Sequence, residues 1–287
     1  MTTIFEPLYA EGQVLSERLF SPLRISDNSH AAWREVRILV DFYRRGLYRK
    51  NDFVGIFSPK FGLKTKTSAL NFIEFVDRNI GADVCIINPF PQILYYSFNV
   101  WMQGEINHPG LMGRAQALLN AVGVDLKIDD APRNDARTLC YSNFWVGTEK
   151  FWDAYIGGVV EPIATFLEEN PEHAVTRSVM GETWHSDAAP FLPFIVERLF
   201  STFLAQHPQI NVAAYPIDDV IPYCLTEYER ELVTGMQPFI DAADARGEFP
   251  AELKAMQELA CRLYVRYAHE HFATNVHPHT GRTIQKV

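Results

Sequence analysis

Lysines and hydroxyls crowd one short segment, residues 58–67 (SPKFGLKTKT), which lies between an expected strand and an expected helix. Ammonium groups attract anions, and the N–H groups at the start of a helix favour negative charge. Lys60 and Lys64 are therefore candidates for binding a nucleotide diphosphate, although exposed loops in general also favour lysine. Asn88 follows the next buried strand and is a candidate for the same ligand, because ligands of parallel sheets bind at the carboxyl ends of strands.

Residues 101–111 (WMQGEINHPGL) combine an aromatic ring with several amide, carboxylate and imidazole groups in an expected loop ahead of a helix. A sugar needs such groups for its hydroxyls and an aromatic ring for its apolar face. The candidates are Trp101, Gln103, Glu105 and His108. The alternative is a helix-entry turn with surface polar groups. Asn143 is expected inside an apolar strand, where its amide must be paired by neighbouring backbone or by a ligand.

Glu197 and Arg198 interrupt an otherwise apolar helical segment, residues 190–200 (PFLPFIVERLF). A carboxylate in such surroundings is either an ion-paired structural group or a general base in a desolvated site. His185 and Asp187 lie just upstream and are candidates for the same site, with Asp187 as a second catalytic carboxylate.

The pairs His269-x-His271 and His277-x-His279 have the spacing of metal ligands, but no cysteine or carboxylate cluster stands beside them. We interpret them as solvated or hydrogen-bonded histidines, with metal binding as the alternative. The four cysteines are far apart and include no CxxC, so we expect buried thiols rather than disulfides or zinc. No GxGxxG, GxxxxGK[ST], GxSxG or HExxH occurs.

The composition is that of a globular protein, because 47% of the 287 residues are hydrophobic and 21% are charged. The net charge of −9 opposes a general nucleic-acid binder. Residues 1–150 hold 17 basic and 16 acidic side chains, whereas residues 151–287 hold 9 and 19. The basic side chains are concentrated in residues 34–66, which suggests a small anionic ligand or, alternatively, a solvated helix face. No run of about 18 apolar residues occurs, so we expect no transmembrane segment and a cytoplasmic location.

Strand-like and helical segments alternate through most of the chain. We expect strands near residues 53–58, 84–87, 137–147 and 210–215. Helices are expected at 30–46, 67–79, 111–122, 149–169 and 193–206, followed by helices from 226 onward with breaks at Pro238 and Pro250. This order predicts an α/β protein, a mostly parallel sheet flanked by helices with a C-terminal helical extension.

Five segments in order resemble bacterial nucleotide-sugar glycosyltransferases with a Rossmann-type GT-A fold, of the kind that assembles surface polysaccharides (O-antigen or capsule). The segments are GIFSPKFGLKT (55–65), DVCIINPFP (83–91), NVWMQGEINHPGL (99–111), YSNFWVGTEKFWDAYI (141–156) and PFIVERLFSTFL (193–204). The resemblance implies a transferase domain over 1–222, with a nucleotide-binding half (1–98) and an acceptor half (99–222), and an extension over 223–287. It places a strand at residues 3–9, residues 7–11, including Tyr9, beside the nucleotide base, and Glu197 where inverting members carry their base.

The family usually holds a divalent metal, Mn²⁺ or Mg²⁺, with a DxD pair, whereas this chain has Ile87-Asn88-Pro89-Phe90 there. Metal dependence is therefore left open, and lysines 60–66 would supply the missing charge. The function expected is transfer of a sugar from a nucleotide-sugar donor to a hydroxyl of a glycan or lipid-linked glycan, by a cytoplasmic enzyme compatible with peripheral association at the inner face of the membrane. The alternatives are a non-catalytic glycan- or nucleotide-binding module and, on the histidine pairs, a metal hydrolase.

Overall fold

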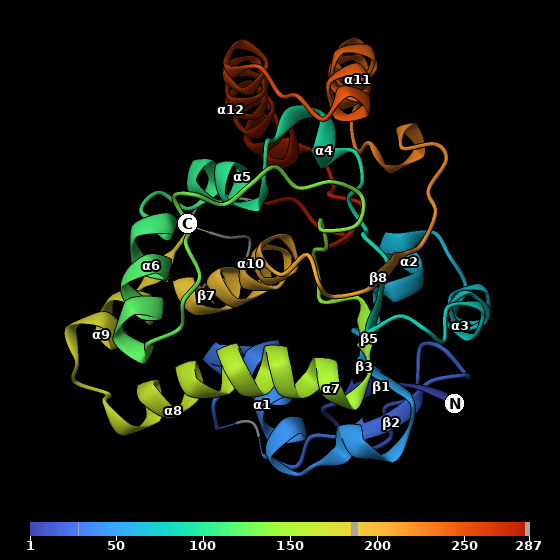
Figure 1. Ribbon diagram of the computed structural model, residues 1–287, viewed down its shortest axis with the longest axis vertical. Helices are drawn as coiled ribbons and strands as arrows, with labels where there is room; N and C mark the ends of the chain where they lie inside the picture. Colours follow the sequence, from blue (N-terminus) through green and yellow to red (C-terminus); the bar gives the residue numbers. More distant parts are fainter. Residues whose placement is uncertain (28, 185–188, 285–287) are drawn as a thin grey trace.

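A six-stranded, mostly parallel sheet forms the centre of the computed structural model, which describes residues 1–27, 29–184 and 189–284 (Figure 1). The strand order is β2-β1-β3-β5-β4-β8, and β5 alone runs antiparallel to its neighbours. The strands are β1 (Thr2–Leu8), β2 (Ser21–Arg24), β3 (Phe53–Ile56), β4 (Val84–Ile86), β5 (Trp145–Gly147) and β8 (Val212–Ala214). A separate two-stranded ribbon pairs β6 (Glu182–Thr183) with β7 (Ala189–Pro190). The predicted α/β architecture is confirmed at this level.

Both faces of the sheet are covered, which explains the continuous apolar runs in its strands. Successive residues of a strand point to opposite faces, so Val84 and Ile86 join the larger core while Cys85 and Ile87 join a smaller, phenylalanine-rich one. Gly55 of β3 lies directly against the backbone of Trp145, where a side chain would not fit.

The helices fall into an N-terminal set around the sheet and a C-terminal pair. The first set is α1 (Glu35–Arg44), α2 (Phe61–Thr65), α3 (Ala69–Arg78), α4 (Ile93–Tyr96), α5 (Val100–Asn107), α6 (Leu111–Val122), α7 (Glu149–Trp152), α8 (Glu161–Glu169), α9 (Ala174–Val179) and α10 (Phe191–Gln206). The pair is α11 (Glu227–Arg246) and α12 (Ala251–Thr274). Short 3₁₀ turns occupy Ala31–Trp33, Leu47–Lys50 and Ile221–Tyr223.

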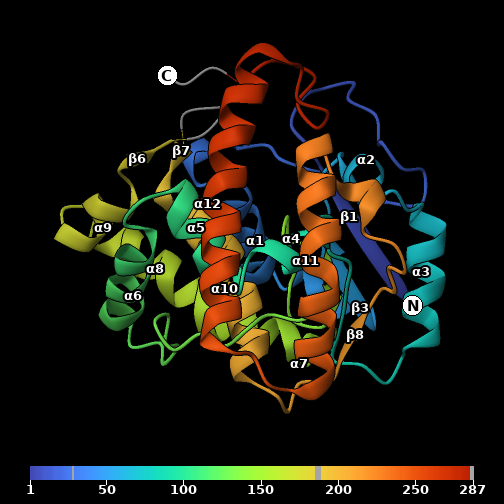
Figure 2. The same ribbon diagram turned by 90° about the horizontal axis from the view of Figure 1, so that it is seen from above.

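Helices α2 and α3 lie on one side of the sheet, and α1, α7, α8 and α10 lie on the other (Figure 1). Helices α11 and α12 run side by side across the top (Figure 2). They pack onto α4, and Gln257 of α12 donates from Nε2 to the Leu94 carbonyl at 2.9 Å. The C-terminal pair therefore packs against the rest of the chain through α4 and α5.

Four local expectations are corrected. Residues 101–107, expected as a loop, belong to α5, which begins where Asn99 caps the N–H groups of residues 101 and 102. The helix expected from residue 30 begins at Glu35, after a 3₁₀ turn. Pro238 does not break α11, which continues through it. The helix over 149–169 contains a π-helical segment, Asp153–Val160.

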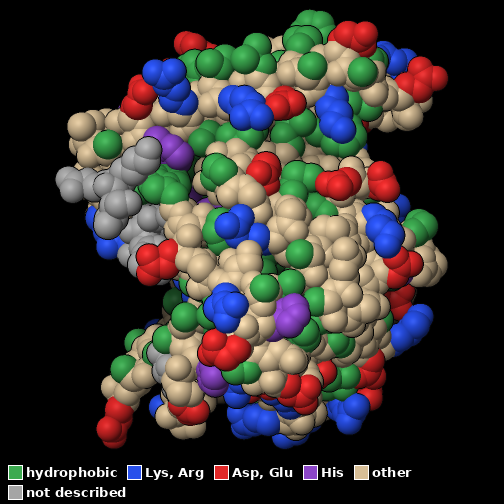
Figure 3. Space-filling view, turned by 90° about the vertical axis from the view of Figure 1, so that its left-hand side faces the viewer, with side chains coloured by type: hydrophobic (Ala, Val, Ile, Leu, Met, Phe, Trp, Pro, Cys, Tyr) green, Lys and Arg blue, Asp and Glu red, His purple; other side chains and the backbone are tan. Residues whose placement is uncertain are grey.

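Hydrophobic side chains remain on the outer surface of α12, among them Met256, Leu259 and Leu263. On the face shown in Figure 3, hydrophobic side chains are interspersed with basic and acidic ones, so the net negative charge does not gather into one acidic area there. Among the described residues, no helix is both long and apolar enough to span a bilayer.

Candidate active-site cleft

One large cleft, with a volume of about 1130 Å³, opens at the carboxyl ends of β1 and β3. Its walls come from segments distant in the sequence: α1, the residues after β3, α2, α5, α10, α12 and the turn that follows α12. The volume slightly exceeds the ~300–1,000 Å³ usual for pockets that take drug-sized ligands. It therefore has room for a nucleotide sugar.

Lys60 and Lys64 supply positive charge to this cleft. Lys64 donates from Nζ to Ser142 Oγ at 2.8 Å, and Lys60 donates to the carbonyl of His279 at 2.9 Å. Neither lysine forms an ion pair with a carboxylate of the described residues at hydrogen-bonding distance. Burial lowers the pKa of Lys64, while the carboxylates of Glu197 and Glu35 act in the opposite direction. Both lysines are thus placed to receive an anionic ligand.

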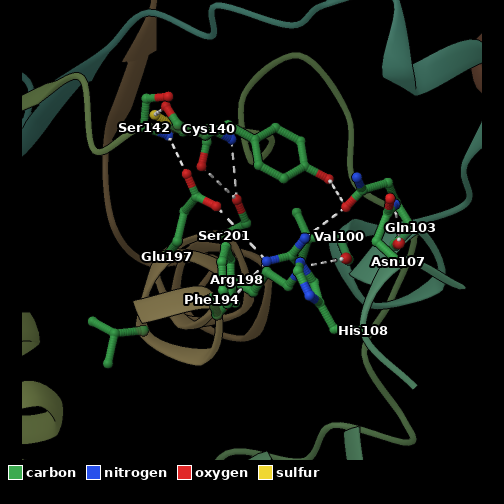
Figure 4. A network of polar contacts seen from close by, with 12 residues as sticks. Val100, Gln103, Asn107, His108, Cys140, Ser142, Phe194, Glu197, Arg198 and Ser201 are labelled. Atoms are coloured by element: carbon green, nitrogen blue, oxygen red, sulfur yellow. Dashed lines mark hydrogen bonds and ion pairs between the residues drawn. The ribbon is translucent and has the colours of Figure 1, made fainter. Parts of the chain in front are cut away.

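Glu197 of α10 points from the helix toward the turn that precedes β5 (Figure 4). Its Oε1 accepts a hydrogen bond from the Ser142 N–H at 2.8 Å, and its side chain is 20% exposed. Ser142 and Asn143 both adopt left-handed backbone conformations, with φ of 62° and 52°. Consecutive non-glycine residues in this region are strained, and such strain tends to persist at functional sites. Two hydrogen bonds fix this strained turn at Ser142, whose N–H donates to Glu197 and whose Oγ accepts from Lys64.

Arg198, the neighbour of Glu197, turns in the opposite direction and is 3% exposed (Figure 4). It donates from Nε to the Val100 carbonyl at 3.0 Å, from Nη1 to the Phe194 carbonyl at 2.9 Å and from Nη2 to Gln103 Oε1 at 2.6 Å. Its Nη1 also lies 3.7 Å from Glu197 Oε2. Arg198 therefore couples α10 to α5 and supplies a partial counter-charge to Glu197.

Asn143 is 6% exposed, lines the cleft, and has no hydrogen-bond partner for either its Oδ1 or its Nδ2 among the described residues. The expectation of an apolar strand there is corrected, since Asn143 lies in the turn before β5. An unpaired buried amide costs free energy, so this side chain is suited to a ligand that both donates and accepts hydrogen bonds. A sugar hydroxyl does both.

Glu35, the first residue of α1, is a carboxyl group of the cleft that lies within the basic segment 34–66 and was not among the predicted site residues. Burial raises its pKa, and the nearby charge of Glu197 raises it further. Burial also raises the pKa of Tyr9, and the charge of Glu35 raises it further. Glu35 and Glu197 are thus two carboxyl groups of the cleft that repel each other and that both act on Lys64.

The cleft brings together seven of the twelve predicted site residues: Tyr9, Lys60, Lys64, Gln103, His108, Asn143 and Glu197. Tyr9 is 53% exposed at the end of β1. Gln103 accepts from Arg198, and the ring of His108 stacks on Phe194 with centroids 4.1 Å apart while its Nδ1 lies 3.2 Å from Thr183 Oγ1.

Three predicted residues do not line the cleft. Asn88 is buried and accepts the Phe90 N–H in a local turn. Trp101 is 1% exposed and donates from Nε1 to Thr202 at 2.7 Å, so its ring offers no face to a sugar. Glu105 accepts the N–H groups of Gly110 and Met112 at the start of α6. His185 and Asp187 lie outside the described residues.

Trp184 is an aromatic residue of the cleft that sequence reasoning missed. Its ring contacts the ring of His269 in a tilted arrangement, with centroids 3.9 Å apart, and its Nε1 has no hydrogen-bond partner among the described residues. The sequence signal was its position beside His185 and Asp187, which had been singled out.

A protein-held metal does not fit the end of β4. Asn88 is engaged with Phe90 there, and among the described residues no group of three His, Cys, Asp or Glu side chains could hold an ion. The two histidine pairs therefore do not assemble into a metal centre within the described part of the chain.

Comparison with family models, with curated proteins and with solved structures finds no match to this chain.

Proposed function

We propose that this protein is a GT-A-type glycosyltransferase that transfers a sugar from a nucleotide-sugar donor to a hydroxyl of a glycan or lipid-linked glycan in bacterial polysaccharide assembly. The observation that carries the proposal is the convergence of Lys60, Lys64, Asn143 and Glu197, from three separate segments, on one large cleft at the carboxyl ends of the strands. In open α/β sheets this edge is where ligands bind.

Each group has a role that its geometry supports. Lys60 and Lys64 bind the diphosphate and stabilise the negative charge that develops as it leaves. Asn143 pairs with sugar hydroxyls. Glu197, oriented by the Ser142 N–H, removes the proton of the acceptor hydroxyl as that oxygen forms the new bond to the sugar. No step is assigned to a metal. A cytoplasmic location, at the inner face of the membrane when the acceptor is lipid-linked, belongs to the same proposal.

The experiment is a turnover assay on a panel of nucleotide sugars, in which release of the nucleoside phosphate is measured with and without EDTA. Release that survives chelation, and that falls at least ~100-fold in Glu197→Gln, supports the transferase. Nucleotide binding without release from any donor indicates the non-catalytic module, and release abolished by EDTA contradicts the roles given to the lysines.

A further inference from the structure

The turn that follows α12 folds back over the cleft and carries two histidines into it. His277 pairs with Arg282 in an isolated β-bridge, and the Ile284 N–H donates to the Phe272 carbonyl at 2.8 Å. His277 and His279 both line the cleft, and their rings lie 5.6 Å apart. Both residues are only partly exposed, and His277 accepts a hydrogen bond, which agrees with the interpretation of hydrogen-bonded histidines.

The same turn contacts the segment that carries the two cleft lysines. Lys60 Nζ donates to the His279 carbonyl at 2.9 Å. Lys64 Nζ lies 5.5 Å from the centre of the Phe90 ring, and the ring of His279 lies 5.6 Å from the same centre. Two ammonium groups and two imidazoles therefore border one part of the cleft.

Burial, together with the neighbouring lysines, favours the neutral form of both imidazoles in the free protein. Burial lowers the pKa of His279 to about 4, with further lowering by Lys64, His277, Lys66 and Lys60. Burial also lowers the pKa of His277, and Lys60 and Lys64 lower it further.

The local hydrogen bond of His277 agrees with a neutral ring. Its Nδ1 accepts the His279 N–H at 3.1 Å, so the ring proton is placed on Nε2. Two carboxylates lie near this region, and the charges of Glu197 and Glu35 raise the pKa of Lys64.

An anion bound between these groups would raise the pKa of both imidazoles, because opposite charge within about 4–6 Å favours the charged form of a histidine. We propose that His277 and His279 join Lys60 and Lys64 in binding the diphosphate of the donor, and that the imidazoles take up protons from solution as it binds. Each imidazole gains one proton and becomes a cation with two N–H donors. At His277 the proton goes to Nδ1, which gives up the hydrogen bond from the His279 N–H. The assignment of the anion as a donor diphosphate rests on the proposed function.

The test is titration calorimetry of the full chain with inorganic pyrophosphate, in two buffers of different ionisation enthalpy at the same pH. The difference in measured heat gives the number of protons taken up. We expect the wild type to take up at least about half a proton more than His277→Asn/His279→Asn. Compared with the wild type, we also expect the double variant to bind pyrophosphate about tenfold more weakly at pH 6 and nearly as tightly at pH 8.5. The reason is that each proton taken up on binding lowers the wild-type affinity about tenfold for each unit by which the pH rises.

The matched control is His271→Asn, since His271 lies on α12 outside the cleft lining and should leave both quantities unchanged. Ring NMR signals of the wild type, recorded with and without pyrophosphate, give the same answer if the double variant fails to fold. They should move toward the imidazolium position for two histidines.

Equal proton uptake and affinity in wild type and double variant, unmoved ring signals, or no pyrophosphate binding by the wild type would each overturn the proposal. If the protein nevertheless turns over a nucleotide sugar, any of these results would reject the role of the two imidazoles in binding the diphosphate and leave the proposed glycosyltransferase function standing. Pyrophosphate binding with proton uptake but no turnover of any donor would keep the anion site and reject the transferase.

Discussion

Glu197→Gln separates the catalytic from the structural contribution of this side chain. The glutamine keeps an oxygen that accepts the Ser142 N–H, so the strained turn at residues 142–143 should be preserved. It cannot accept a proton from an acceptor hydroxyl, and it removes the charge 3.7 Å from the Arg198 guanidinium. The structure therefore predicts a folded variant with a specific chemical defect.

The size of both effects follows from the contacts. Breaking a buried ion pair costs about 3–5 kcal/mol. Glu197 is 20% exposed and Arg198 retains three hydrogen bonds, so we expect a loss of about 1–2 kcal/mol, or roughly 2–8 °C in melting temperature for a chain of this size. Turnover should fall at least ~100-fold while the affinity for nucleoside diphosphate stays within about threefold, because the glutamine leaves Lys60 and Lys64 in place.

The assays are thermal unfolding, calorimetry with nucleoside diphosphate, and release of the nucleotide from its sugar. Glu105→Gln is the matched control, since Glu105 bonds to backbone N–H groups at the start of α6 and does not line the cleft. It should lower stability and leave turnover unchanged. Near-normal turnover in Glu197→Gln would refute the reasoning, and a stability loss above about 5 kcal/mol would show that the carboxylate is chiefly structural.

Further outcomes follow for other residues of the cleft and its surroundings. Lys60→Ala combined with Lys64→Ala should weaken nucleoside diphosphate binding roughly 10- to 100-fold in calorimetry, and unchanged affinity would remove these lysines from the site. Trp101→Phe should cost about 1–3 kcal/mol of unfolding free energy, because Thr202 loses its buried donor, with turnover within about twofold; a selective loss of turnover would contradict the buried position. Burial raises the pKa of Glu35 above 4.5, so the stability contributed by its protonated form is lost as pH rises from about 4.5 through the folded-state pKa. Glu35→Gln should therefore melt higher than the wild type at pH 8 and not at pH 4, and equal differences at both pH values would count against the repulsion.

The elements that could be predicted from the sequence are those whose burial pattern is regular. The apolar run at 84–87 and the apolar segment at 193–206 became β4 and α10, because in both the surrounding core agrees with the local pattern. Glycine and polar residues predict a loop at 101–107, and this prediction is wrong because Asn99 caps a helix there. Pro238 predicts a break between two helices, yet α11 continues through it.

The candidate site was predictable only in part, because spacing along the chain does not show which way a side chain faces. Lys60 and Lys64 were found from their position after a strand, and they line the cleft. Trp101 was assigned to a sugar by its polar neighbours, but α5 turns it into the core. Glu35 and the turn bearing His277 come to the cleft from opposite ends of the chain, and only the tertiary structure places them there.

The most direct test of the account is a crystal structure of the full chain with a nucleoside diphosphate sugar. The account predicts the diphosphate against Lys60 and Lys64, with the sugar beside Asn143 and its reactive carbon facing the space in front of Glu197. A ligand seated outside this cleft, or inside it with the diphosphate remote from both lysines, would contradict the central claim.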